Sequence, residues 1–451
     1  MPHREENKPW KKLESLLVLG EGKALHDFLD TMNSAEIARA ISRLGDEEQA
    51  NLLTLLEPED AADLIEELSE TQGADLIEDL DSEHAAAIVD EMESDHRVDV
   101  LGEMDKDDAE AIIQEMNPEE AEEVRKLLEH DPDTAGGVMI TEFVVYSQAL
   151  TVGDVLDDLR TNAEAYSDYG VQYAYVSSMK NTLIGVLRLR DLVLSSNDVP
   201  IQQVMIVNPV SVLTDTSLEE LEQTFDRFNF SGLPVIAPEG NIVGVVQRAD
   251  TEEALSNRAE KTFMRFSGII GGDEIRTEPV FVRSTQRLWW LAANLVLSLM
   301  AASVIIYFQD TVEKNIALAA LIPVLANLSG CSGNQAIAVS IREMTLGLIT
   351  HEDVARVVRM ELVVGIFNGL ILGILLGGFI LIWKGDMMLG LVVGLALSLN
   401  TVLSVALGGA IPLLLRKVNI DPAVAAAPIL TTVVDMCGFF LILSLASTFL
   451  L

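Results

Sequence analysis

The sequence predicts a mostly α-helical membrane protein in which a helical repeat, a small mixed α/β part, a connecting helix and five membrane helices follow one another. Apolar stretches of membrane-crossing length fill the C-terminal third, an apolar residue recurs every twelve positions near the N-terminus, and two strand-rich units lie between them. The expected boundaries are 1–130 for the acidic helical superhelix, 131–200 and 201–252 for two α/β units, 253–285 for the connecting helix and its linker, and 286–451 for the membrane domain.

Five apolar stretches are each long enough for the ~20 residues that a bilayer-crossing helix needs. They are Leu288 to Phe308, Ile316 to Ile341, Leu362 to Trp383, Met388 to Leu415 and Ala423 to Leu451. Basic residues gather in the loops after the second and fourth stretches, and such loops stay in the cytoplasm. The chain opens with a polar run that has no signal-peptide pattern. We therefore expect a multi-pass protein of the plasma (inner) membrane, with its N-terminus in the cytoplasm and its C-terminus outside.

The net charge of −40 lies almost entirely before the spans. From Gln286 onward nine acidic and eight basic side chains nearly balance, which leaves −39 on the first 285 residues. Such a polyanion disfavours nucleic acid as a partner and attracts divalent cations, although a merely solubilising acidic surface explains the same charge. The two cysteines, Cys331 and Cys437, both fall within spans and lack any zinc-site spacing.

The first 130 residues repeat with a period of twelve. A large apolar residue recurs at Met32, Leu44, Leu56, Leu68, Leu80, Met92, Met104, Met116 and Leu128. Helix caps such as Asn33, Ser69 and Asp81 precede apolar pairs, so each unit is expected to form a short helix. One such unit cannot bury its own apolar face, and neighbours are therefore expected to stack into a superhelix. This region is either a plain scaffold or a movable acidic module that responds to cations.

Residues 136–250 contain two βαβ-like units that each end in a strand, a glycine and an aspartate. This pattern resembles a tandem pair of cystathionine-β-synthase (CBS) domains. The resemblance implies an adenine nucleotide such as ATP as a ligand, with Asp191 and Asp250 holding the ribose hydroxyls. Arg188 and Gln247 stand where CBS domains usually carry a Ser or Thr that contacts phosphate, so the nucleotide prediction departs from the family pattern there.

Asp435 is the only carboxylate inside the last apolar stretch, and an ionisable group within a span is costly and usually functional. Polar and small residues follow helical spacing on the last, second and fourth stretches. These residues are Pro428, Thr431, Asp435 and Gly438; Pro323, Asn327, Gly330 and Asn334; and Asn400, Thr401, Ser404 and Gly408. The stripes predict faces that line a pore, and ordinary helix-packing seams are the alternative. For Asp435 itself, the alternative is a protonated structural carboxyl.

With the membrane part included, the order of parts resembles that of the MgtE-type magnesium channels over nearly the whole chain. The segment Asp133 to Phe143, the run Gly333 to Ala336 and the stretch Asp421 to Gly438 carry the most specific likeness. The resemblance implies a non-enzymatic homodimer in the lipid bilayer with one pore on the two-fold axis. Two Asp435 carboxylates would then face each other and accept hydrogen bonds from the water shell of a bound Mg²⁺.

The resemblance also implies gating by cytoplasmic Mg²⁺ that bridges acidic residues on the superhelix, the second CBS domain and the connecting helix. Glu219, Asp250 and Glu253 are the candidate regulatory ligands. Arg258 and Lys261, however, stand where the family carries carboxylates. One hypothesis is that these two cations pair with the acidic superhelix and replace bridging Mg²⁺ by fixed charges. The alternative is that Lys261 extends toward lipid head groups.

Three function classes follow. The first is a divalent-cation channel driven by the electrochemical gradient, since no P-loop ATPase motif occurs in the sequence. The second is a proton- or sodium-coupled Mg²⁺/Co²⁺ transporter that uses Asp435, for which Pro323 and Gly330 would break the second span. The third is a membrane-anchored nucleotide sensor, against which the polar stripes argue.

Overall fold

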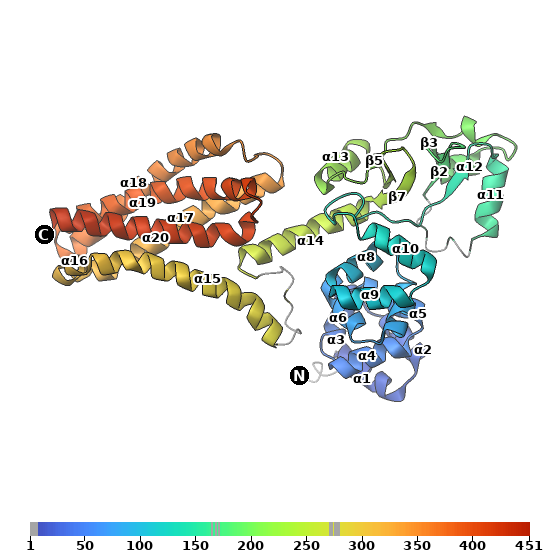
Figure 1. The fold of residues 1–451 in the computed structure, drawn as a ribbon, viewed down its shortest axis with the longest axis horizontal. Coiled ribbons are helices and arrows are strands. Elements are labelled where there is room, and N and C mark those ends of the chain that lie inside the picture. The colour runs from blue at the N-terminus through green and yellow to red at the C-terminus, as the bar shows by residue number, and fades with distance from the viewer. Residues whose placement is uncertain (1–7, 164–165, 167–168, 170–171, 270–273, 275–279) are drawn as a thin grey trace, which may run out of the picture. The chain divides into compact units, whose positions relative to one another are not determined.

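The computed structural model describes residues 8–163, 166, 169, 172–269, 274 and 280–451, and the chain divides into two units, Met1–Asn257 and Arg258–Leu451 (Figure 1). Each unit has its own apolar cores. The fold class expected from the sequence is confirmed: a helical N-terminal part, a pair of small sheets with helices, and five helices long and apolar enough to cross a membrane.

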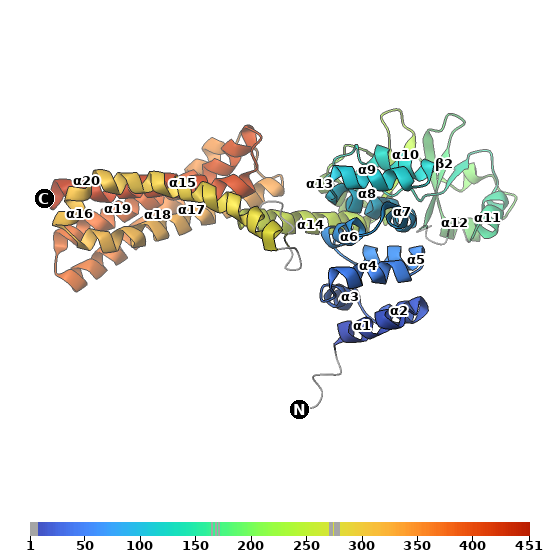
Figure 2. The ribbon, with the colours of Figure 1, turned by 60° about the horizontal axis from the view of Figure 1, so that its bottom comes forward.

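Short helices form the N-terminal part and stack in the order of the repeat (Figure 2). They are α1 (Pro9–Leu19), α2 (Gly22–Leu29), α3 (Ser34–Ile41), α4 (Asp46–Leu55), α5 (Pro58–Glu66), α6 (Glu70–Glu78), α7 (Ser82–Val89), α8 (Ser94–Glu103), α9 (Lys106–Glu115) and α10 (Pro118–Leu127). Side chains of Asn33, Ser69 and Asp81 accept hydrogen bonds from backbone N–H groups of the helices that they cap. The apolar pairs lie in one continuous core, which explains why no helix of this length needs to be stable alone.

Two small sheets follow, one for each CBS-like half. The first has the order β1-β2-β3-β4 and the second the order β5-β6-β7. The strands are β1 (Val145–Ser147), β2 (Tyr173–Ser177), β3 (Leu183–Arg188), β4 (Ile206–Val207), β5 (Val212–Leu213), β6 (Gly232–Ile236) and β7 (Ile242–Gln247), with α11 (Val152–Thr161), α12 (Leu189–Leu194), a 3₁₀ turn (Ile201–Gln203) and α13 (Leu218–Phe228). In each half a parallel pair is followed by an antiparallel hairpin. Isolated bridges Thr182↔Asn241 and Ile140↔Val245 tie the second half to the first and to the preceding segment.

A single helix, α14 (Arg248–Phe266), leads out of the second sheet and crosses from one unit to the other. It begins before residue 253, where the connecting segment was expected to start, because the strand β7 ends at Gln247 and passes directly into the helix. The Ser231 carbonyl accepts the Arg248 N–H at 3.0 Å and fixes this junction.

The second unit is a helical bundle (Figure 1). Its helices are α15 (Val280–Tyr307), α16 (Gln309–Lys314), α17 (Ala317–Thr345), α18 (Val354–Lys384), α19 (Met387–Lys417) and α20 (Pro422–Phe449). All of them except the short α16 are candidate spans, and α19 is the most buried of the five while α15 is the most exposed. Glycines allow α18 and α19 to approach closely: a Cβ on Gly369 would lie 2.7 Å from the Ser398 carbonyl oxygen.

Candidate ion pathway and regulatory sites

Asp435 lies near the middle of α20 and is half-buried within the single chain. Thr431, one turn earlier, is exposed, whereas Pro428 and Gly438 are buried. The polar residues predicted on this span are therefore divided between the surface and the interior of the bundle. Thr431 lies at the surface, whereas Pro428 and Gly438 pack inside. An exposed hydroxyl and a half-exposed carboxylate on an otherwise apolar span are what a partner protomer or water would contact.

The stripe on α17 is divided in the same way. Pro323, inside the helix, and Asn327 are exposed, while Gly330 is buried. Asn334 is half-buried, and its side-chain oxygen is buried without a hydrogen-bond partner among the described residues. The face of α17 that carries Asn327 thus presents an amide at the surface of the described chain.

The stripe on α19 faces inward. Asn400, Thr401 and Ser404 are each 0% exposed. The Ser404 hydroxyl donates to the Ser329 carbonyl of α17 at 2.6 Å. For this span the structure therefore agrees with a helix-packing seam rather than a face open to a pore.

The end of α14 is joined to the start of α20. Arg265 Nη1 lies 3.7 Å from Asp421 Oδ2, and Asp421 also caps α20 by accepting the Ala423 N–H at 2.8 Å. Phe266 packs against the apolar cluster that includes Leu430 and Val434 of α20. A displacement of this part of α14 would consequently act on the helix that carries Asp435.

A second group of ionisable side chains surrounds the first turn of α8. One ligand atom from each of Glu93, Asp95 and His96 lies within 4.8 Å of the others, a set that could hold a divalent cation. The Ser94 N–H and hydroxyl donate to the Glu142 carboxylate at 3.2 and 2.8 Å, and Thr141 N–H donates to Ser94 Oγ at 2.9 Å. This junction attaches the superhelix to the segment that precedes the first sheet.

Burial among like charges shifts the pKa values at this junction. Burial, reinforced by Asp95, raises the pKa of Glu93 to about 7 and that of Asp250 to about 6. The hydrogen bond with Asp95 raises the pKa of His96 to about 10. Asp250, in the first turn of α14, is thus electrostatically coupled to α8, although the two lie far apart in the sequence.

The other predicted regulatory residues occupy different places. Glu219 is half-buried in the first turn of α13, whereas Glu253 is exposed on α14. Arg258 and Lys261 follow on α14, both half-buried, and each makes at least one polar interaction. Asp250 lies at the junction around α8, where it interacts electrostatically with Asp95 and His96.

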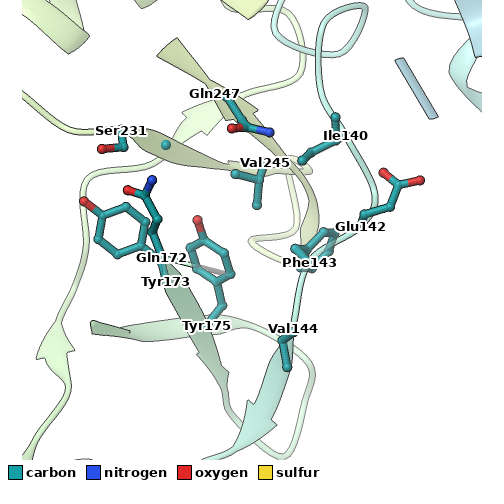
Figure 3. A pocket seen from close by; sticks show the side chains of 11 residues that line it. Ile140, Glu142, Phe143, Val144, Gln172, Tyr173, Tyr175, Ser231, Val245 and Gln247 are labelled. Carbon is teal, nitrogen blue, oxygen red and sulfur yellow. The ribbon is translucent and has the colours of Figure 1, made fainter. Parts of the chain in front are cut away.

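A pocket opens between the two CBS-like halves (Figure 3). Its walls come from the segment before β1, from the start of β2, and from β6 and β7. They are formed by Ile140, Glu142, Phe143, Val144, Gln172, Tyr173, Tyr175, Ser231, Gly232, Val245 and Gln247. Gln247, which stands where CBS domains usually carry a phosphate-contacting Ser or Thr, lines this pocket.

Neither predicted ribose ligand is among the pocket-lining residues. Asp191 accepts a hydrogen bond from Arg188 Nε at 2.6 Å, and Asp250 lies near α8. Among the described residues that line the pocket there is no Lys, Arg or His. A triphosphate would need cationic donors, so these walls do not fit the charged part of ATP. The ribose roles of Asp191 and Asp250 stay predictions.

The junction around α8 was not predicted from the sequence. One signal was available in the sequence, since Arg97 stands at the repeat position that holds Ala85 twelve residues earlier and Ala109 twelve residues later, and it is buried as they are. The neighbouring Ser94 and Asp95 interact with Glu142 and Asp250, which are distant in sequence and are brought close only in the folded chain.

Comparison with known proteins identifies the family. A family model described as a divalent cation transporter matches residues 322–445, a model of the MgtE intracellular N domain matches 32–133, and a CBS domain model matches 201–257. The magnesium transporter MgtE of Thermus thermophilus is 33% identical over 327 residues, which cover 72% of this chain and 72% of the relative. The chain belongs to the MgtE family. The MgtE of Bacillus subtilis is 29% identical over 72% of each chain.

Two solved structures extend the MgtE likeness to the fold of the soluble part. The soluble part of a magnesium transporter matches with 25% identity and a TM-score of 0.51 over 56% of this chain and 100% of that one. The cytosolic domain of the Mg²⁺ channel MgtE in complex with ATP matches with 30% identity and a TM-score of 0.50 over 54% and 99%. The resemblance seen in the sequence is confirmed. Membership of a transporter family, together with five apolar helices, indicates a multi-pass membrane protein for magnesium transport rather than an enzyme.

Proposed function

We propose that this chain forms a homodimeric channel that conducts partly hydrated Mg²⁺ into the cytoplasm, with the half-buried carboxylate of Asp435 as the central ion site. The observation that carries the proposal is the position of this carboxylate, which lies midway along an apolar helix and is not enclosed by its own protomer. An uncompensated charge in a bilayer is costly, so a cation and a second protomer are the natural partners.

The exposed polar groups on α17 and α20 support a pore on a two-fold axis. Asn327 and Thr431 face outward from the single protomer, and symmetry would place each beside its copy. Because Mg²⁺ loses its water shell reluctantly, paired carboxylates that accept hydrogen bonds from that shell would hold the ion without stripping it. Pro323, Gly330, Asn334 and Pro428 would shape the same pathway.

We propose that the cytoplasmic parts gate this pore. The acidic side chains around α8, together with Asp250, are suited to a regulatory divalent cation. Arg265 and Asp421 would transmit a displacement of α14 to α20. Glu219 and Glu253 are further candidate ligands, and the basic residues Arg258 and Lys261 would weaken the dependence of closure on Mg²⁺.

The remaining assignments follow from the same proposal. The N-terminus would lie in the cytoplasm and the C-terminus outside the inner membrane, with the division into parts at residues 130, 200, 252 and 285. A solved MgtE cytosolic domain is described as a complex with ATP. An adenine nucleotide bound to this chain would need a cation from elsewhere for its phosphates, because no Lys, Arg or His is among the described residues that line the pocket between the CBS-like halves.

Uptake of Mg²⁺ into proteoliposomes tests the function, with and without a pH gradient. Asp435→Asn should abolish uptake, while the intact chain should be indifferent to the pH gradient. Asp386→Asn is the matched control, since Asp386 caps α19 outside the apolar part of the span and Asn preserves such a cap.

A proton- or sodium-coupled divalent-cation transporter is the competing function. The break of the second span that was predicted for it at Pro323 and Gly330 is not seen, because α17 runs as one continuous helix from Ala317 to Thr345. Uptake that rises with a proton or sodium gradient would establish a coupled divalent-cation transporter instead of a channel.

A further inference from the structure

We propose that Trp290 on α15 is a positioning residue that couples the end of α14 to α20, the helix that carries Asp435. Its ring supports the turn that ends α14, and its N–H satisfies a backbone carbonyl that Pro428 leaves without a helical donor. The inference rests on the proposed function, in which a displacement of α14 acts on α20, and it names a residue that this coupling requires. All the residues concerned belong to the second unit, Arg258–Leu451.

The turn that ends α14 contains a left-handed glycine. Gly268 has a φ of +89°, and its N–H donates to the Arg265 carbonyl at 3.0 Å, while the Ile269 N–H donates to the Met264 carbonyl at 3.1 Å. These two hydrogen bonds around a left-handed glycine form the Schellman motif, which commonly ends a helix. The last turn of α14 therefore has a defined geometry, and a contact that holds Gly268 holds the end of the helix.

The indole ring of Trp290 lies against this turn. Gly268 is buried, and a Cβ at this position would be 2.7 to 2.9 Å from three carbon atoms of the Trp290 ring. Because no side chain fits between the turn and the ring, the backbone of the turn packs directly on the indole. Trp290 is half-buried, whereas the preceding residue, Trp289, is 74% exposed. Trp290 is thus the tryptophan against which α14 ends.

The indole N–H of the same side chain reaches α20. Trp290 Nε1–H donates to the Val424 carbonyl oxygen at 3.4 Å. In a regular α-helix this carbonyl accepts the N–H of the residue four positions later, which here is Pro428 and has no N–H. A backbone carbonyl that is removed from water without a donor is costly. Trp290 therefore supplies the hydrogen bond that Pro428 takes away from the helix of Asp435.

This contact is independent of the ion pair between Arg265 and Asp421. Those two side chains are 42% and 43% exposed and lie 3.7 Å apart, so water weakens their attraction. The contact of Gly268 with the indole is buried and apolar. A displacement of α14 would therefore carry Trp290 with it or separate the turn from the ring. If Trp290 moves, its hydrogen bond with the Val424 carbonyl is lost, and α20 is free to bend at its proline.

Hydrogen exchange of the full-length protein in detergent tests the structural link. Trp290→Phe keeps a ring beside Gly268 but removes the donor, so exchange should rise several-fold at the α20 amides that follow Pro428 and stay unchanged at residues 264–269. Trp290→Ala should raise exchange in both segments. Trp289→Ala, at an exposed position, should change neither. Unchanged exchange in both segments of Trp290→Ala would refute the link, whether or not the chain conducts ions.

Two glycines separate the ring contact from backbone strain. Gly268→Ala and Gly347→Ala each place a side chain at a left-handed position, with φ of +89° and +66°. At position 347 no described atom lies within 4 Å of a Cβ, whereas at position 268 the Trp290 ring does. Both variants should lower the unfolding temperature, but Gly268→Ala should do so by more. An equal or smaller loss for Gly268→Ala would contradict the contact with the ring.

Single-channel recording separates a positioning role from a merely structural one. At saturating cytoplasmic Mg²⁺, Trp290→Ala should raise the ratio of open to closed states by about tenfold and leave the single-channel conductance unchanged, because α20 no longer follows α14. Trp290→Phe should show a smaller rise, since it keeps the ring, and Trp289→Ala should show none.

An unchanged ratio in Trp290→Ala, or a lower conductance without a change in the ratio, would overturn the positioning role. Absence of Mg²⁺ current from the intact chain would instead contradict the proposed function. Hydrogen exchange then still decides whether Trp290 joins α14 to α20.

Discussion

The side-chain amide of Asn400 on α19 lies directly against Gly438 on α20. A Cβ at position 438 would be 2.5 Å from Asn400 Nδ2, so only glycine fits there without a shift. Asn400 is 0% exposed, and neither of its amide atoms has a hydrogen-bond partner among the described residues. Gly438 follows Asp435 by one helical turn. The packing of α19 therefore limits how far α20, which carries the proposed ion site, can move toward the centre of the bundle.

Gly438→Ala should displace α20 or force Asn400 from its place. We expect a loss of about 1–3 kcal/mol in stability, as is typical of overpacking, and a several-fold lower rate of Mg²⁺ uptake because Asp435 moves with the helix. Thermal unfolding of the detergent-solubilised protein and uptake into proteoliposomes measure the two effects.

Gly378→Ala on α18 provides the comparison, since nothing lies within 4 Å of a Cβ at that position. Gly378→Ala should leave the stability and the rate of Mg²⁺ uptake near those of the unchanged protein. Equal behaviour of the two variants would contradict the steric account of Gly438.

Asp421 should show separable roles as a cap and as a charge. Asp421→Asn retains a side-chain acceptor for the Ala423 N–H and loses only the ion pair with Arg265. Because that ion pair is half-exposed, the free energy of unfolding should fall by less than about 1 kcal/mol. Asp421→Ala also removes the cap and should cost roughly 1 kcal/mol more. Thermal unfolding ranks the variants, and a larger loss for Asn than for Ala would exclude the cap assignment.

Stability of the metal-free protein should fall as pH rises from 5 to 8. The folded-state pKa values of Glu93 and Asp250 are raised to about 7 and about 6 from 4.5 and 3.8, so between the lower and the higher value of each group the folded state binds more protons than the unfolded state. This stabilisation is lost as the two carboxyls ionise. His96, with a pKa raised to about 10, acts in the same direction at higher pH. After allowance for partial exposure, the loss should be on the order of 1 kcal/mol.

Unfolding temperature as a function of pH, with and without Mg²⁺, measures this effect on the intact chain. Glu93→Gln should flatten the pH dependence, whereas Glu253→Gln, at an exposed position, should not. Added Mg²⁺ should restore stability near pH 8, because the ion favours ionised carboxylates. A protein that gains stability with rising pH would contradict the account.

Local patterns sufficed to predict most of the fold. Caps such as Asn33 and Asp81 begin helices as expected, since the hydrogen bonds that cap a helix involve neighbours in sequence. The five candidate spans were also predictable, because the length and hydropathy of a local stretch are enough to identify a membrane-crossing helix. The helix α15 begins at Val280, before the predicted apolar stretch that starts at Leu288, because polar residues 283–287 belong to the helix but give no hydropathy signal.

The candidate sites were harder to predict from the sequence than the fold. Helical spacing placed Pro428, Thr431 and Asp435 on one stripe, but it could not show that the stripe runs along the edge of the bundle, with Pro428 inside and Thr431 outside. Helical periodicity shows which residues share one face of a helix, but it does not show what packs against that face. The contact of Ser94 with Glu142 depends on the packing of two parts of the chain, and no local pattern encodes it.

Single-channel recording in planar bilayers tests the central claim most directly. With Mg²⁺ gradients imposed, the intact chain should pass current whose reversal potential follows the Mg²⁺ gradient and ignores a pH difference, and Asp435→Asn should pass none. A reversal potential that moves with the pH difference, or Mg²⁺ current that survives Asp435→Asn, would contradict a channel with Asp435 in its pore.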